Sequence, residues 1–305
     1  MKKLLESLSR RQRQIIIGLT ALIIATWGGF WLVASRPVSP PAAPIILQPA
    51  KTPADYFASL DLLAAAYIVY NAETGETLFA QNEHEPRSLA SITKVMTALV
   101  LAETVDPQAL VYIDNIDYGA GGNAGGLYPG EAWQVENLLA LTLVGSSNYG
   151  AEALGRASLN LVGQMNDSAQ ALGFSSLVFN NVSGLDNGSA QGGTGSALDV
   201  ARLFAHILKN QPRLLEPTRQ VFVQETSLDH FDHTAVNTNK IVATIPGLLA
   251  SKTGYTDRAG GNLAVAANLG LKRPTVFVVL GSTTEGRFAD MKQLLAATLA
   301  YYADQ

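Results

Sequence analysis

The chain has 305 residues, room enough for one large domain or two ordinary ones. Hydrophobic residues make up 48% of it and charged residues 15%, a composition typical of a folded protein. The net charge of −4 gives no indication of a nucleic-acid partner, and the absence of cysteine excludes disulfides, thiol catalysis and thiolate metal sites.

The N-terminal segment predicts a membrane anchor. Residues 15–34 carry no charge and are numerous enough to cross a bilayer as a helix, with Trp27 and Trp31 in the outer half. Basic residues stay on the cytoplasmic side, so we expect a cytoplasmic tail over 1–14, a single-pass cell-membrane anchor over 15–34 and an extracytoplasmic remainder. A cleaved signal peptide is the alternative, since Val33 and Ser35 are small enough for a cleavage site. The basic residues of the tail are Lys2, Lys3, Arg10, Arg11 and Arg13.

A proline-rich stretch follows the predicted anchor. Prolines recur through residues 35–55 and favour an extended spacer over regular structure. Residues 56–305 then remain for one catalytic domain.

Strands are expected at both ends of this domain, with helices between them. Residues 65–70 and 77–81 form a predicted hairpin, and strands are expected over 247–252, 262–268 and 275–280. Apolar spacing predicts a buried helix over 91–104 and an amphipathic closing helix after residue 287. The pattern indicates an α+β fold, an antiparallel sheet flanked by helices with an inserted helical subdomain. Further helices are expected over 135–143, 151–171 and 197–208, with glycine- and asparagine-rich loops over 118–130 and 180–195.

Three short segments carry residues suited to chemistry: Ser91-Ile-Thr-Lys94, Ser146-Ser-Asn148 and Lys252-Thr-Gly254. Residues three apart share a helix face, so Lys94 can reach the Ser91 hydroxyl, and a desolvated lysine can act as a general base. Each segment alone can also be explained without a catalytic role. A serine and a lysine three apart arise by chance, and the second segment is typical of a helix cap. The third segment is expected to end a strand, with its glycine allowing a close backbone approach.

Taken together in this order, the segments resemble the active-site signature of penicillin-binding proteins and serine β-lactamases. The surrounding residues narrow the likeness to the serine-type D-alanyl-D-alanine carboxypeptidases, the low-molecular-mass penicillin-binding proteins. It extends from about residue 65 to the C-terminus and so covers the predicted catalytic domain. The matching stretches are Asn71–Leu78, Pro86–Thr97, Pro129–Glu131 before Leu138–Leu139, Ser183–Asp186 and Lys252–Leu263.

The resemblance implies roles for the motif residues. Ser91 would attack the bond between two D-alanines of a peptidoglycan stem peptide, with Lys94 taking its proton and Ser146 relaying a proton to the leaving amine. Asn148 would bind the substrate amide, and Lys252 and Thr253 its carboxylate. The peptide N–H groups of Ser91 and of Tyr255, after Gly254, would bind the oxyanion. β-Lactams would act as covalent inhibitors, and no cofactor or metal is implied.

This chain departs from some relatives at two positions. Several have histidine where Tyr255 stands, and some have an arginine for the substrate carboxylate where this chain has Ser282. Arg258 or Arg287 is a possible substitute.

Four other interpretations stay open. A D,D-endopeptidase uses the same apparatus, and a non-catalytic wall-binding protein could keep the fold. A class A-like β-lactamase needs a deacylating glutamate, and none lies between Glu152 and Glu216. Asp229, His230, Asp232 and His233 form a cluster, but their spacing matches no standard metal site, so a solvated loop or strand edge is expected.

Overall fold

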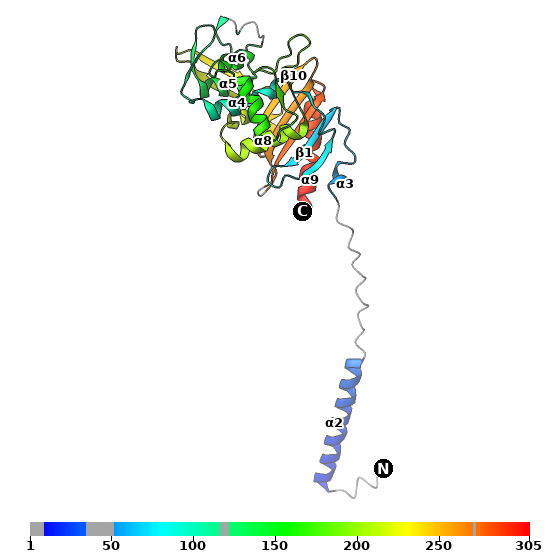
Figure 1. Cartoon of the computed structure of the whole chain (residues 1–305). Coiled ribbons are helices and arrows are strands. Elements are labelled where there is room, and N and C mark those ends of the chain that lie inside the picture. Colours follow the sequence, from blue (N-terminus) through cyan, green and yellow to red (C-terminus); the bar gives the residue numbers. More distant parts are fainter. Residues whose placement is uncertain (1–8, 35–51, 116, 118–121, 271–272) are drawn as a thin grey trace. The chain divides into compact units, whose positions relative to one another are not determined.

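The computed structural model describes residues 9–34, 52–115, 117, 122–270 and 273–305. The chain divides into two units, Met1–Ala50 and Lys51–Gln305 (Figure 1). In the first unit the helix α2 spans Arg10–Ala34, and three arginines lie in its first turn.

The structure does not support the expected bilayer-spanning helix over 15–34. No helix in the described part of the chain is both long and apolar enough to cross a membrane. The helix that contains this stretch starts at Arg10. Residues 35–51 of the proline-rich stretch lie outside the described residues. The expectation of an irregular spacer is wrong at its end, because a short helix begins at Pro53.

A five-stranded antiparallel sheet organises the second unit. Its strand order is β10-β11-β12-β1-β2, so strands from both ends of the domain lie side by side, as the sequence predicts. The first hairpin is confirmed, with Val69 opposite Phe79. The strands are β1 (Ala66–Asn71), β2 (Thr77–Gln81), β10 (Leu248–Thr256), β11 (Gly260–Asn268) and β12 (Pro274–Ser282).

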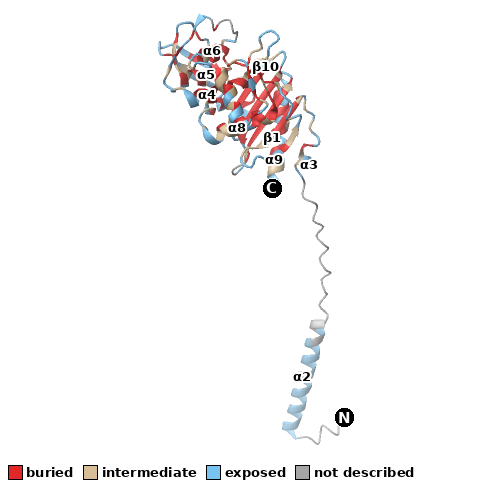
Figure 2. Ribbon diagram, viewed as in Figure 1, coloured by how far each residue is buried: buried red, intermediate tan, exposed pale blue. Residues whose placement is uncertain are grey.

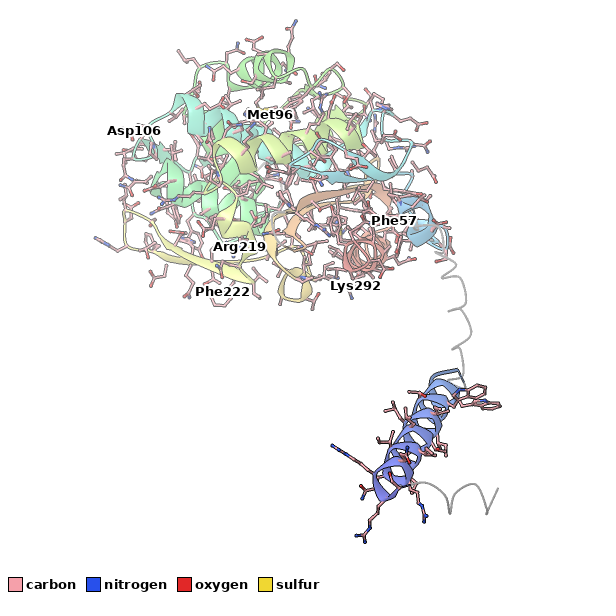
Figure 3. All side chains as sticks on the ribbon, turned by 90° about the horizontal axis from the view of Figure 1, so that it is seen from below. Phe57, Met96, Asp106, Arg219, Phe222 and Lys292 are labelled. Carbon is pink, nitrogen blue, oxygen red and sulfur yellow. The ribbon has the colours of Figure 1, made fainter. Side chains whose placement is uncertain are left out.

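The central strands are buried on both faces, because helices cover each side of the sheet (Figure 2). Ile68 and Val278 point into a core shared with α4 (Lys94–Thr104) and α8 (Ala197–Asn210). Their neighbours in the strands point to the opposite face, where α9 (Gly286–Ala303) and the short helix α3 (Pro53–Phe57) pack. Figure 3 shows Phe57 of α3 near α9, the helix that carries Lys292.

A helical subdomain is inserted between β2 and β10, as expected. It contains α5 (Val135–Gly145), α6 (Asn148–Gly155) and α7 (Leu161–Ala171). The single helix predicted over 151–171 is wrong, because residues 156–160 separate α6 from α7 and Asn160 adopts a left-handed conformation.

Several short elements lie in segments where no regular structure is expected from the sequence. The strands β8 (Phe222–Thr226) and β9 (Asp232–Val236) form a hairpin beside α5. Their alternation of exposed and buried residues is too short to stand out in the sequence. The remaining strands are β3 (Arg87–Ser88), β4 (Leu110–Tyr112), β5 (Ala132–Gln134), β6 (Val178–Phe179) and β7 (Gly193–Gly195), and two of the 3₁₀ turns are η3 (Glu216–Arg219) and η4 (Val242–Thr244). A further 3₁₀ turn, η1 (Ala90–Thr93), replaces the first turn of the helix expected over 91–104.

Candidate active site

Ser91 lies in the 3₁₀ turn η1, immediately before α4 begins at Lys94. The residue before it, Ala90, has a φ of 47°, a left-handed conformation that is uncommon for a residue with a Cβ. Such conformations persist only where the surrounding structure enforces them, and they concentrate at functional sites. Ser91 is half-buried, whereas Lys94 is only 1% exposed. The turn therefore presents a hydroxyl at the surface above a buried amine.

The Lys94 amine lies in hydrogen-bond contact with the Ser91 hydroxyl. Its Nζ is 2.9 Å from Ser91 Oγ and donates to Asn148 Oδ1 at 2.8 Å and to the Ser183 carbonyl at 2.6 Å. Burial lowers the pKa of Lys94 to about 7, against a smaller opposing effect of the Glu152 charge. A large fraction of this amine is therefore neutral near neutral pH and can accept a proton from the hydroxyl.

The second motif spans the junction between α5 and α6. Ser146 follows α5 with a φ of 59°, and its half-buried hydroxyl accepts a hydrogen bond from Lys252 Nζ at 2.8 Å. Ser147 caps α6 by accepting from the Gly150 N–H at 3.2 Å. The helix-cap interpretation thus holds for Ser147, whereas Ser146 and Asn148 contact the two lysines.

The third motif lies inside strand β10, which continues to Thr256. The expectation that the strand ends at Gly254 is wrong, because β11 pairs with β10 beyond this point. Lys252 and Thr253 are both buried, and Thr253 Oγ1 lies 2.5 Å from Thr238 Oγ1. Burial, and then the charges of Lys94 and Arg287, lower the pKa of Lys252 well below its ordinary value.

Gly254 brings the strand β10 against the turn that holds the serine. A Cβ at this position would lie 2.6 Å from the Leu89 carbonyl oxygen and 3.2 Å from the Ser91 nitrogen. Both neighbours are backbone atoms, which cannot rotate away as a side chain can. A residue without a Cβ is therefore required for this approach.

We expect Gly254→Ala to push β10 away from Ser91. Relieving the contact with Leu89 should destabilise the fold by about 1–3 kcal/mol, the usual range for overpacking. The rate of acylation by a fluorescent penicillin should fall by about tenfold or more, because the third motif moves relative to the hydroxyl. Thermal unfolding and acylation kinetics measure the two effects, and an unchanged acylation rate would show that the close approach is not needed.

The positions that depart from some relatives, and the two arginines considered as substitutes, have distinct surroundings. Tyr255 is 49% exposed beside the site, and Ser282 is buried and donates to Asp290 Oδ2 at 2.7 Å. Arg258 donates to the carbonyl of Ser189 at 2.8 Å. Arg287 is buried and donates to the carbonyl of Gly254 at 2.8 Å. Of the two arginines, Arg287 is therefore the one bonded to the third motif.

Two contributors to this site were not expected from the sequence. The carbonyl of Ser183 accepts from Lys94, and Thr238 holds Thr253. Ser183 belongs to a stretch that matches the family. Every residue has a backbone carbonyl, however, so the residue type does not predict this contact. Thr238 follows β9, a strand that the sequence did not predict.

The cluster over 229–233 is divided between solvent and the protein interior. Among the described residues, no three histidine or acidic side chains lie close enough together to hold a metal ion. The expectation that the whole cluster is solvated is wrong for His233, which is 4% exposed and points inward from β9. Its Nε2 lies 3.1 Å from Glu131 Oε1.

A half-buried serine hydroxyl bonded to a buried, partly neutral lysine, on a helix-covered antiparallel sheet, defines a serine hydrolase of the penicillin-binding type. The chain belongs to the D-alanyl-D-alanine carboxypeptidase family, whose model matches residues 51–284.

Individual relatives agree with this assignment. The chain is 29% identical over 249 residues to D-alanyl-D-alanine carboxypeptidase DacF of Bacillus subtilis, a match covering 78% of this chain and 63% of that protein. It is 29% identical to DacB2 of Mycobacterium tuberculosis over 73% of this chain and 77% of that one. Penicillin-binding protein D2 of Listeria monocytogenes, solved in a cefotaxime-bound form, superposes with a TM-score of 0.69 at 30% identity, covering 78% of this chain and 98% of that one. The expected fold class is confirmed.

Proposed function

We propose that this chain is a serine D,D-carboxypeptidase that removes the terminal D-alanine from peptidoglycan stem pentapeptides through an acyl-enzyme on Ser91. One observation carries the proposal: the Lys94 amine, with its pKa lowered to about 7, lies 2.9 Å from the Ser91 hydroxyl. Membership of the carboxypeptidase family supports the choice of substrate. The enzyme acts on the extracytoplasmic side, where the wall polymer lies.

Acylation begins with a proton transfer. Neutral Lys94 takes the Ser91 hydroxyl proton as the oxygen bonds to the carbonyl carbon of the penultimate D-alanine. The negative oxygen is stabilised by the N–H groups of Ser91 and Tyr255, each worth about 3 kcal/mol for a donor of this kind. The close approach of Gly254 to the Ser91 nitrogen supports this placement of the two donors.

Collapse of the intermediate breaks the C–N bond and releases D-alanine. Ser146 passes its proton to the departing amine and takes up the proton that Lys94 received from Ser91, so Lys94 becomes neutral again. The hydrogen bond from Lys252 holds the Ser146 hydroxyl in place. Water then attacks the ester, with Lys94 again as the base, and frees Ser91 for another cycle.

The substrate is held by the second and third motifs. Asn148 contacts the peptide amide, while Lys252 and Thr253 bind the terminal carboxylate. Burial, and then the nearby Lys94 and Arg287, disfavour the charged form of Lys252. An incoming carboxylate favours that charged form and so gains a strong contact. A free C-terminus is therefore selected over an internal peptide bond.

We expect a penicilloyl-enzyme to persist. A class A β-lactamase deacylates through a glutamate and water, and this chain has no glutamate between Glu152 and Glu216. The antibiotic also keeps its leaving group tethered beside the ester. Intact-mass measurements after removal of free penicillin should show the adduct on Ser91 long after mixing. Rapid recovery of unmodified protein would favour the β-lactamase alternative.

A digest of purified pentapeptide tests the proposed reaction. Release of free D-alanine and appearance of the tetrapeptide are the expected result, and both should disappear after penicillin treatment. Cleavage of cross-linked muropeptides without D-alanine release from pentapeptide would instead indicate a D,D-endopeptidase. A chain that neither cuts nor takes up penicillin would be a non-catalytic wall-binding protein.

We also propose that the helix α2 attaches the enzyme to a membrane. Its apolar side chains are solvent-exposed in the described structure, among them Ile24 at 67%, Trp27 at 72% and Trp31 at 73%. Arginines at one end of the helix and tryptophans towards the other suit a membrane interface. Deleting residues 10–34 should move the protein from the membrane fraction to the soluble one. Carbonate extraction distinguishes an embedded helix from one bound at the surface.

A further inference from the structure

The segment 122–131 lies against the second motif. Its Gly122 carbonyl accepts from the Asn148 N–H at 3.1 Å, at the first residue of α6. Ala124 packs against Gly145, the last residue of α5, where an added Cβ would lie 3.1 Å from the alanine Cβ. The segment therefore touches both residues that flank the Ser146–Ser147 pair.

A buried histidine and a buried glutamate hold the other half of this segment. His233 and Glu131 are 4% and 3% exposed, and His233 Nε2 lies 3.1 Å from Glu131 Oε1. His233 Nδ1 lies 2.8 Å from the carbonyl oxygen of Gly125, which can only accept. Nδ1 therefore donates to this carbonyl, and Nε2 is the ring atom that faces the carboxylate. Glu131 Oε2 accepts from the Trp133 indole at 3.1 Å, so Oε1 is the oxygen that faces His233.

The strand β9 connects this pair to the motif. His233 and Ala235 alternate with exposed residues and point to the same buried side. Ala235 lies opposite Gly145, where an added Cβ would be 3.0 Å from the alanine Cβ. Gly145 is thus enclosed by Ala124 from the segment and Ala235 from the strand, and His233 bonds these two elements to each other.

We propose that His233 and Glu131 are positioning residues that set the geometry of Ser146 and Asn148 by holding the segment 122–131 against them. Neither residue touches the reacting atoms. They act through Asn148, which orients Lys94, and through the end of α5, which places Ser146. The inference rests on the proposed function for its kinetic part.

Loss of either partner should release the segment. A carboxylate or imidazole left alone in the protein interior lacks its compensating bond, so the segment moves to where the group meets water. Asn148 then loses the Gly122 acceptor, and the Lys94 amine loses its fixed position beside the Ser91 hydroxyl. Acylation depends steeply on that alignment.

Two substitutions of His233 test its contacts with Gly125 and Glu131 one at a time. His233→Asn places an amide near the Nδ1 position and keeps a donor for Gly125, whereas His233→Gln reaches towards Glu131. Glu131→Gln removes the charge but keeps an acceptor for Trp133. His84→Gln is the matched control, since His84 has a side chain that is 77% exposed and lies outside the site.

Three readouts are measured on the full chain: the penicillin acylation rate, hydrogen exchange at the Asn148 amide and over 122–131, and thermal unfolding. We expect acylation to fall by about tenfold in each of the three site variants, with faster exchange at Asn148, and no change in the control. The double variant Glu131→Gln with His233→Gln should be within about twofold of the worse single variant, because one contact is lost in both.

Variants that acylate at the normal rate per folded molecule would overturn the proposal, even with a lower unfolding temperature, because the pair would then be merely structural. Unchanged exchange at Asn148 would overturn it equally. Failure of the unmodified chain to acylate would instead count against the proposed function, while the exchange data would still decide whether the pair holds the segment.

Discussion

Replacing Ser91 with alanine should abolish both D-alanine release and penicillin labelling, with a loss on the order of 10⁴-fold or greater. The Ser91 oxygen forms the covalent bond to the substrate carbonyl carbon, and alanine has no atom that can take its place. The fold should survive, since Ser91 is half-buried and its replacement removes one oxygen at the rim of the site. Steady-state assays on pentapeptide and intact-mass measurement of penicillin adducts check this result.

Ser158→Ala is a suitable control for this change. Its hydroxyl donates to Gln164 at 2.9 Å, away from the three motifs, so acylation should be unaffected. Normal labelling of the Ser91→Ala protein would place the nucleophile elsewhere and remove the mechanism.

The acylation rate should rise with pH through a midpoint near the pKa of Lys94, about 7. Burial disfavours the charged amine, so protons leave Lys94 at lower pH than they leave an ordinary lysine. Only the neutral form can take the Ser91 proton, and acylation is therefore slow below this midpoint and reaches a plateau above it. Lys94→Arg should cost about 10³-fold at every pH, because a guanidinium stays protonated. Stopped-flow acylation across a pH series measures both effects.

Glu152→Gln gives a second test of Lys94 as the general base. The Glu152 charge raises the pKa of Lys94, so its removal should shift the midpoint to lower pH with the plateau kept. A rate that does not depend on pH in this region, or a fully active Lys94→Arg protein, would contradict the role of the lysine as base.

Much of the fold follows from local sequence patterns. The hairpin of β1 and β2 is marked by β-forming residues on both sides of a Thr74-Gly75 turn, and α4 by continuous apolar spacing. These signals act over a few residues, so they are visible in the sequence. The hairpin of β8 and β9 was missed, because its burial pattern depends on packing against α5. The same applies to the break between α6 and α7.

Residue spacing alone predicts only one of the contacts in the site. The separation of Ser91 from Lys94 permits their contact, since residues three apart lie on one helix face. No spacing rule brings Lys252 to Ser146 at 2.8 Å across 106 residues of chain. Only the resemblance to a family placed both residues in one site, and it gives no distance between them.

The amino-acid sequence by itself determined the elements of the sheet, the order of the three motifs and the absence of thiol chemistry. These properties depend on residue type and on neighbours along the chain. Tertiary structure decided the protonation of Lys94 and Lys252, the close approach of Gly254 to Ser91, and the burial of His233 against Glu131. A pKa and a steric contact depend on what surrounds a group in space, and here those surroundings come from distant parts of the chain.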